Sequence, residues 1–298
     1  ASKNIKEIGA EAFYDCKALE TIDLRSLEQN EIYDSTFSGC ESMDGIKIPE
    51  VVTKVGSGAF YGCKTLSNIE LHDGISEIGG ACFGNCTGLK KITMPIDMKY
   101  IAQKNLGNMS SSFSGCTNVE ELYYTKGKTG IMPDRIDDNS GKDWCFRGTV
   151  ELIAFNSLRK IEYEDGITRI GNYATFSKYQ LGNESYMDAR ETLTEVIVPD
   201  SVTSIGEKAF YNCEKIPEIA SKNIKEIGAE AFYDCKALET IDLRSLEQNE
   251  IYDSTFYGCE SLKKISISKN VSGLSLLNIS LHVITVTRFS VLDKLIIL

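Results

Sequence analysis

The chain has 298 residues, of which 42% are hydrophobic and 25% are charged, a composition that can bury a globular core. Its 43 acidic and 32 basic side chains leave a net charge of −11, which disfavours nucleic acid, because phosphate contacts depend on Lys and Arg, and disfavours anionic lipid. His72 and His282 are the sole histidines, so most histidine-dependent catalysis and metal ligation is excluded.

One tetrapeptide, Phe-x-x-Cys, recurs eight times along the chain, and most neighbouring copies lie 22 to 24 residues apart. A fixed period of this length is typical of solenoids and repeat arrays. Length alone suggests two domains, at about 150 residues each. The repeat instead favours one elongated domain of about ten turns over residues 1–272. The copies begin at Phe13, Phe37, Phe60, Phe83, Phe113, Phe210, Phe232 and Phe256.

Two turns show the unit: residues 55–71 read VGSGAFYGCKTLSNIEL, and residues 78–94 read IGGACFGNCTGLKKITM. The alternation in Ile69-Glu70-Leu71 predicts a strand that points Ile and Leu inward. The three-residue spacings of Ala-Phe-x-x-Cys-x-x-Leu predict a short helical turn on the opposite side of the coil. The Gly of the consensus Ile-Gly pair, such as Gly56, marks a bend that requires either positive φ or close packing. Stacked turns therefore form a parallel sheet and bury jointly a core that no single turn buries alone.

Two insertions interrupt the period, at about residues 125–149 and 177–190. The first contains the sole tryptophan, Trp144, and the second contains Tyr179 and Tyr186. Insertions in a solenoid become surface loops, often on a binding face.

The turns beside these insertions are degenerate. Ala154-Phe155 with Leu158 and Ile161 indicates a turn that has lost its Cys, and Gly171 with Phe176 indicates another. The middle of the chain therefore continues the repeat in a weaker form.

The first insertion contains two candidates for chemistry. The run DRIDDNSGKD, residues 134–143, could hold Ca²⁺ through its carboxylates, but the spacing does not fit an EF-hand and a solvated acidic loop is favoured. Cys145 lies outside the repeated positions and could act as a nucleophile, but no histidine lies near it in sequence to serve as a base. We therefore favour a loop residue that packs against its own insertion.

Residues 220–261 repeat residues 1–42 with one difference, Tyr257 in place of Ser38. Because the identity extends to positions expected to be exposed, it indicates recent segmental duplication. Ala1 lacks the strand that precedes its counterpart, so we expect a piece of a longer protein or the loss of an export signal.

Residues 273–298 are apolar but include charged side chains, and no stretch is long enough to span a bilayer. The first interpretation is an amphipathic C-terminal cap. A membrane-associated tail and a truncated reading frame are the alternatives.

The pattern resembles the BspA-like leucine-rich repeat family over about residues 1–272. Frames such as Ile205-Gly206, Ala209-Phe210 and Cys213, together with the Leu-x-x-Ile-x-Leu strands, carry the resemblance. It implies an α/β fold, a right-handed leucine-rich repeat solenoid with a parallel sheet on one side and short helical turns on the other. It also implies an extracellular or cell-surface location and roles in adhesion and protein binding.

The repeated cysteines could be disulfides, metal ligands or plain core. Equivalent residues of stacked turns lie about 4.8 Å apart, which a disulfide tolerates. Side chains in register point the same way, however, and free Cys behaves as a small buried hydrophobe. Buried thiols are therefore favoured, and a metal is least favoured because Cys-x-x-Cys pairs are absent. No cofactor is expected.

One outward side chain from each strand forms a mixed row that could be a platform for a partner or an ordinary solvated face. Aromatic residues are enriched in binding hot spots, so the candidate anchors on the row and insertions are Tyr123, Trp144, Tyr179, Tyr186 and Ile197. The row itself comprises Asp23, Lys47, Glu70, Thr93, Tyr123, Glu162, Ile197, Asp242 and Ser266.

The first functional hypothesis is a non-enzymatic, monomeric surface or secreted protein that binds a host or cell-surface protein or glycan. The second is a structural spacer of a larger surface protein, without a ligand of its own. An enzyme with a site in the insertions is the remote third. None of these involves nucleic acid or a membrane span.

Overall fold

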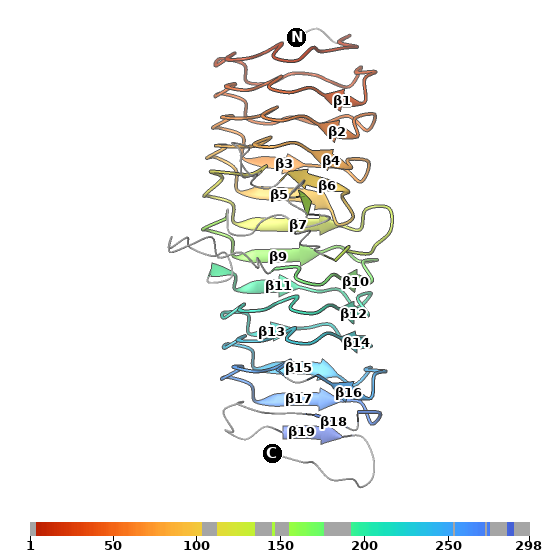
Figure 1. Cartoon of the computed structure of the whole chain (residues 1–298). Helices are drawn as coiled ribbons and strands as arrows, with labels where there is room; N and C mark the ends of the chain where they lie inside the picture. Colours follow the sequence, from red (N-terminus) through yellow and green to blue (C-terminus); the bar gives the residue numbers. More distant parts are fainter. Residues whose placement is uncertain are drawn as a thin grey trace. The chain divides into compact units, whose positions relative to one another are not determined.

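The computed structural model describes residues 4–102, 112–134, 145–146, 155–175, 192–252, 254–271, 273–274 and 285–288. The chain divides into two compact units: residues 1–129 with 136–158 form unit 1, and residues 130–135 with 159–298 form unit 2. Within each unit, short strands of successive turns lie side by side (Figure 1). Among the described residues, no helix is both long and apolar enough to cross a membrane.

Unit 1 contains two rows of strands. The first row pairs Ile69 with Ile92 and Ile92 with Leu122, all in parallel register. The second row is also parallel except at its last pair, where Ala102 and Cys145 face each other on antiparallel strands. The first row is β3 (Asn68–Glu70), β5 (Lys91–Pro95) and β7 (Glu121–Thr125); the second is β1 (Glu31–Ile32), β2 (Lys54–Val55), β4 (Glu77–Ile78), β6 (Tyr100–Ala102) and β8 (Cys145–Phe146).

Unit 2 repeats this arrangement with parallel pairs throughout its described strands. On one side are β9 (Lys160–Tyr163) with β11 (Glu195–Ile197), and β13 (Glu218–Ile219), β15 (Thr240–Leu243), β17 (Lys264–Ile267) and β19 (Thr285–Arg288). On the other are β10 (Arg169–Ile170), β12 (Ser204–Ile205) and β14 (Glu226–Ile227), and β16 (Glu250–Ile251) with β18 (Gly273–Leu274). The predicted parallel sheet is thereby confirmed. Two segments of the apolar stretch 273–298, β18 and β19, add strands to these rows.

Stacked phenylalanine rings fill the core of each unit. In unit 1 the ring centroids of Phe37, Phe60, Phe83 and Phe113 follow one another at 5.3, 5.3 and 5.2 Å, with nearly parallel planes. In unit 2 the Phe210, Phe232 and Phe256 centroids are 5.5 and 5.7 Å apart. All of these rings are buried, as their spacing in the sequence predicts.

The repeated cysteines form a second column beside the rings. Six of these thiols donate a hydrogen bond to the Phe carbonyl of the preceding turn, for example from Cys86 Sγ to Phe60 O at 3.0 Å and from Cys235 Sγ to Phe210 O at 3.2 Å. The nine described cysteines are free and eight are buried; seven of these eight hold the repeated position, and for them the prediction of buried thiols is confirmed. The prediction is wrong for Cys16, which is exposed because it belongs to the first described turn and has a neighbouring turn on one side alone.

The segment from Ala through Phe to Cys consists of turns in the described copies, so the predicted helical turn is not confirmed. Ser35 (φ 53°) and Gly39 (φ 77°), on either side of Phe37, adopt the left-handed region and interrupt a helical path. The intervening Phe37 N–H then points along the stack and donates to the Ala59 carbonyl of the next turn at 2.8 Å. Hydrogen bonds between turns thus replace those within a helix.

The degenerate turns keep the backbone pattern with other side chains. Leu158 N donates to Phe155 O at 3.3 Å, as Leu66 N does to Cys63 O, so Phe155 occupies the Cys position. Its ring accordingly meets Phe113 edge-on, at 65°, instead of stacking.

In the second degenerate turn, Thr175 occupies the Phe position. Its N–H donates to Ala209 O at 3.0 Å, as Phe210 N does to Ala231 O at 2.9 Å. Thr175 Oγ1 donates to the same Ala209 carbonyl at 2.7 Å and lies 3.4 Å from Cys213 Sγ. The prediction that Phe176 supplies the phenylalanine of this turn is therefore wrong by one position, and Phe176 itself lies outside the described residues.

Candidate functional site

The outward positions of the strands lie in register within each unit. In unit 1, Glu70 pairs with Thr93 and Thr93 with Tyr123, while the residues before them point into the core. In unit 2, Glu162 pairs with Ile197 and Asp242 with Ser266. Ser266 is buried, with 8% of its surface exposed, so the predicted outward row is wrong at that position.

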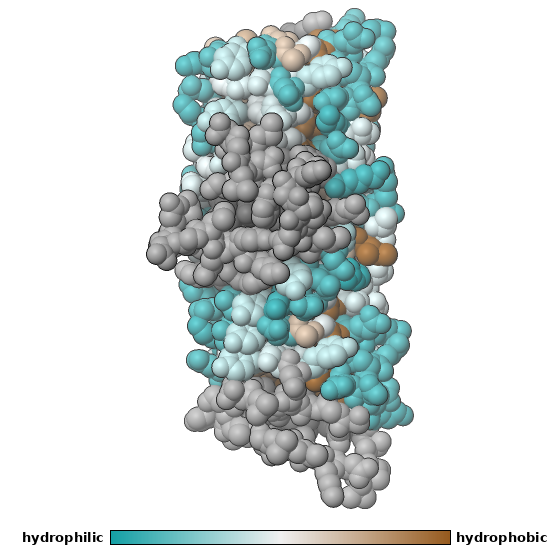
Figure 2. Space-filling model, in the orientation of Figure 1, coloured by the Kyte–Doolittle hydropathy of each residue, from teal (hydrophilic) through white to brown (hydrophobic). Residues whose placement is uncertain are grey.

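The five predicted anchor residues have different outcomes. Tyr123 is half-buried on β7 of unit 1, and Ile197 is 37% exposed on β11 of unit 2. Trp144, Tyr179 and Tyr186 lie outside the described residues. Hydrophilic residues cover most of the described surface in view, and hydrophobic ones form small separate areas (Figure 2).

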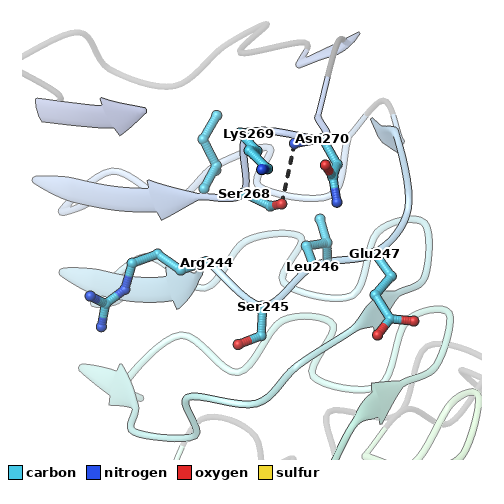
Figure 3. Close-up of a pocket in the computed structure, with 8 residues that line it drawn as sticks. Arg244, Ser245, Leu246, Glu247, Ser268, Lys269 and Asn270 are labelled. Atoms are coloured by element: carbon cyan, nitrogen blue, oxygen red, sulfur yellow. Dashed lines mark hydrogen bonds between the residues drawn. The ribbon is translucent and has the colours of Figure 1, made fainter. Parts of the chain in front are cut away.

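A shallow hollow of about 410 Å³ lies where β15 and β17 end, a feature that the sequence analysis missed. Arg244 and Glu247 lie on opposite sides of Leu246 along one wall (Figure 3). The other wall is the segment 267–270, in which Asn270 N donates to Ser268 Oγ at 3.2 Å.

Two of the three charged side chains that line the hollow, Arg244 and Glu247, already have partners. Arg244 Nε and Nη2 donate to the Asp242 carboxylate at 2.9 and 2.5 Å, and these hydrogen bonds lower the pKa of Asp242 and raise that of Arg244. Glu247 forms an ion pair with Lys225 at 2.7 Å. The hollow therefore presents few free charges to a ligand.

The first copy of the duplicated segment reproduces one wall of this hollow. Arg25 Nη2 lies 2.7 Å from Asp23 Oδ2, as in the second copy. The facing wall differs, because Pro49 and Glu50 occupy the positions of Ser268 and Lys269.

The described candidates for catalysis or metal binding make structural contacts. His72 Nε2 lies 3.0 Å from Pro49 O, and its Nδ1 accepts from Gly74 N at 3.1 Å. The Asp134 carboxylate pairs with Arg169 and accepts from Asn172 N at 2.9 Å.

The structure describes the two candidates of the first insertion, the acidic run 134–143 and Cys145, only in part. The remainder of the acidic run 134–143 lies outside the described residues, as does the side chain of Cys145. Within the described ranges, no three His, Cys, Asp or Glu side chains are grouped to hold a metal.

A row of tyrosines on the edge of the turns in unit 2 was also not predicted from the sequence. Tyr211 stacks on Tyr233, and Tyr233 on Tyr257, with centroids 4.7 and 4.6 Å apart. The signal was present in the repeat, because Tyr recurs directly after the core Phe at residues 14, 61, 211, 233 and 257.

A family model for the BspA type leucine-rich repeat region matches residues 1–112, 30–178 and 179–289, with six copies of the repeat. These matches span nearly the whole chain. The chain belongs to the BspA-type leucine-rich repeat family. No curated protein matches this BspA-type chain.

Three solved structures are similar to the BspA-type chain. A leucine-rich repeat protein from Bacteroides ovatus is 21% identical, with 97% of this chain and 83% of the other covered and a TM-score of 0.41. A leucine-rich cell surface protein from Faecalibacterium prausnitzii is 21% identical, with coverages of 87% and 83% and a TM-score of 0.37. The pneumococcal vaccine antigen PcpA is 19% identical, with coverages of 92% and 67% and a TM-score of 0.34.

Proposed function

We propose that this BspA-type protein is a non-enzymatic surface or secreted protein that binds a protein or glycan through the outward face of its strands and its inserted loops. The observation that carries the proposal is the register of the outward row. It sets Tyr123 beside Thr93 in unit 1 and Ile197 beside Glu162 in unit 2. Rigid strands that present aromatic, apolar and charged groups at fixed spacing lose little conformational entropy when a partner binds.

The environment of Ile197 supports this role. Its side chain is 37% exposed, whereas Val196 before it is buried. The neighbouring Glu162 is held by Lys160 at 2.8 Å, so a charged pair borders the apolar side chain. An apolar anchor with a polar rim is the usual composition of a binding hot spot.

The non-enzymatic part of the proposal is supported by the contacts of His72 and Asp134, both of which serve the packing of neighbouring turns. The extracellular location follows the resemblance to BspA-like surface proteins.

The test is a binding screen with matched variants. Purified chain is applied to a glycan array and to a panel of immobilised extracellular-matrix proteins. We expect a reproducible ligand whose affinity falls about 10-fold or more in the Tyr123→Ala, Ile197→Ser double variant, as for loss of a hot spot. Tyr252→Ala is the control, because Tyr252 is 51% exposed but follows β16 in the other row.

Two outcomes would count against binding at this face. Folded protein that gives no signal above background would favour the spacer function. If a ligand binds the double variant and the wild type with the same affinity, its binding surface does not include the outward strand row.

A further inference from the structure

The three stacked tyrosines of unit 2 form a continuous row, here called the tyrosine ladder: Tyr211, Tyr233 and Tyr257. Their ring planes are nearly parallel, at 8° and 12°, with centroids 4.7 and 4.6 Å apart. Each follows a buried phenylalanine, and each is itself half-buried on the edge of its turn. The ladder therefore holds three phenols against one another at a surface that small molecules reach.

The duplicated segment provides an internal comparison. Tyr14 is the counterpart of Tyr233, and the single difference between the copies replaces Tyr257 by Ser38. Tyr14 is 55% exposed, whereas Tyr233 is half-buried between rings. The one residue that distinguishes the copies thus adds the last ring of the ladder.

Tyr61 is a second isolated phenol at the same repeat position. Ser38 precedes it and Gly84 follows it in the neighbouring turns, and it is 42% exposed. The same protein therefore carries stacked and isolated tyrosines in equivalent backbone settings.

We infer that the tyrosine ladder is a site of oxidative cross-linking, at which hydrogen peroxide and a haem peroxidase join neighbouring rings as dityrosine. Because the residues hold equivalent positions of successive turns, their ε carbons are separated by about one strand spacing, ~4.8 Å. The χ2 torsion of tyrosine is broad, so a ring on the turn edge tilts toward its neighbour without a backbone change. Proximity of this kind converts a bimolecular coupling into an intramolecular one.

The reaction balances with peroxide as the oxidant. Each of two tyrosines loses one electron and its phenolic proton to give a tyrosyl radical. The radicals combine through a bond between ε carbons, and the hydrogen on each bonded carbon moves to its phenolic oxygen and restores the aromatic ring. The two electrons and two protons reduce one hydrogen peroxide to two molecules of water.

The surroundings of the ladder preserve the radicals for coupling. Cys235, two residues after Tyr233 in the sequence, is buried and donates to a backbone carbonyl. Burial also raises the pKa of the Cys235 thiol, so little thiolate is available to reduce a radical. A bond from Tyr233 to either neighbour would join turns that are 22 or 24 residues apart in sequence.

The experiment treats the full chain at low concentration with hydrogen peroxide and a haem peroxidase. Dityrosine fluorescence is measured on the monomer band of a denaturing gel, and cross-linked tryptic peptides are mapped by mass spectrometry. We expect fluorescent monomer whose cross-links join Tyr233 to Tyr211 or Tyr257. Tyr233→Phe keeps the stacked ring but removes the phenol, so it should lose most of the fluorescence.

Two further variants use the duplicated copies as controls. Tyr257→Ser gives the second copy the residue of the first and should leave only the link between Tyr211 and Tyr233. Ser38→Tyr should create a new cross-link to Tyr14 or Tyr61, whereas Tyr14→Phe in the wild-type background should change nothing. Undiminished fluorescence in Tyr233→Phe, cross-links mapped to other tyrosines, or cross-links between molecules alone would each overturn the inference.

Discussion

At the scale of single residues, the repeated phenylalanines are among the largest fully buried side chains of the core. Phe60 is fully buried and stacks on Phe37 and Phe83 at 5.3 Å on both sides. Phe13 has one stacked neighbour, Phe37, at 5.4 Å, and is half-buried. The two positions are chemically identical and differ only in how many turns cover them.

This difference predicts unequal costs of truncation. Phe60→Ala should lower the free energy of unfolding by about 3–5 kcal/mol, since it removes a buried ring and leaves a cavity between two others. Phe13→Ala should cost clearly less, because solvent already reaches that ring. Denaturant unfolding of both variants measures this, and equal losses would contradict the stacked core.

The buried thiols make stability depend on pH in the alkaline range. Burial raises the pKa of Cys259 from 9.0 to about 12 in the folded chain. Below pH 9 the thiol is protonated in both the folded and the unfolded chain, and its full contribution to the free energy of unfolding is present. Between pH 9 and about 12 the unfolded thiol loses its proton while the folded one keeps it, so stability falls as pH rises.

The pH dependence gives a second prediction. The wild-type free energy of unfolding should fall above pH 9 more steeply than that of Cys259→Ala, by about 1.4 kcal/mol per pH unit. Parallel denaturant titrations over this range measure the two slopes. Indistinguishable slopes would show that this thiol is not protected in the folded state.

At the scale of the repeated elements, the glycine that follows β2, β4, β10, β12 and β14 is explained by close packing. Gly56 does not adopt positive φ, but a Cβ on it would lie 2.7 Å from Asp34 N and 2.8 Å from the Tyr33 carbonyl carbon. Gly9, at the same position of the first turn, would meet nothing within 4 Å. The adjacent turn, not the local backbone, therefore requires glycine.

A matched pair of substitutions tests this explanation. Gly56→Ala should destabilise the chain by about 1–3 kcal/mol, because two backbone segments must move apart. Gly9→Ala should be close to neutral. Thermal unfolding of the two variants makes the comparison, and a similar loss for both would point to local conformation as the cause.

At the scale of the whole molecule, many exposed ion pairs link neighbouring turns, although acidic residues outnumber basic ones and leave a net charge of −11. Glu41 lies 3.5 Å from Lys17 and 3.0 Å from Lys64, and the hydrogen bond from Lys64 lowers the pKa of Glu41. All three side chains are substantially exposed, so salt screens them. The turns are held together mainly by buried rings and by backbone hydrogen bonds between turns.

High salt should therefore change stability little. Raising the sodium chloride concentration far above physiological should shift the melting temperature less than Phe60→Ala does, since screening acts on exposed pairs and leaves the core intact. Differential scanning calorimetry of the wild type at low and high salt provides the measurement. A loss at high salt larger than that of Phe60→Ala would assign the stability to the ion pairs.

Much of this architecture was predictable from the sequence by itself. The recurrence of Phe, Cys and alternating aliphatic residues identified the buried positions, because a stacked turn places the same repeat position at the same depth each time. Phe60, Cys63 and Ile69 are buried as expected, and the outward neighbours Glu70 and Thr93 lie in register.

Features that depend on contacts with the adjacent turn were decided only by the tertiary structure. It separated close packing from positive φ at Gly56, assigned Thr175 to a phenylalanine position, and brought Tyr233 against Tyr257 while Tyr14 has Ser38 beside it. The physical reason is that periodicity reports how deep a residue lies within its own turn. Contacts across the few ångströms between turns depend on two segments that are more than twenty residues apart in the chain.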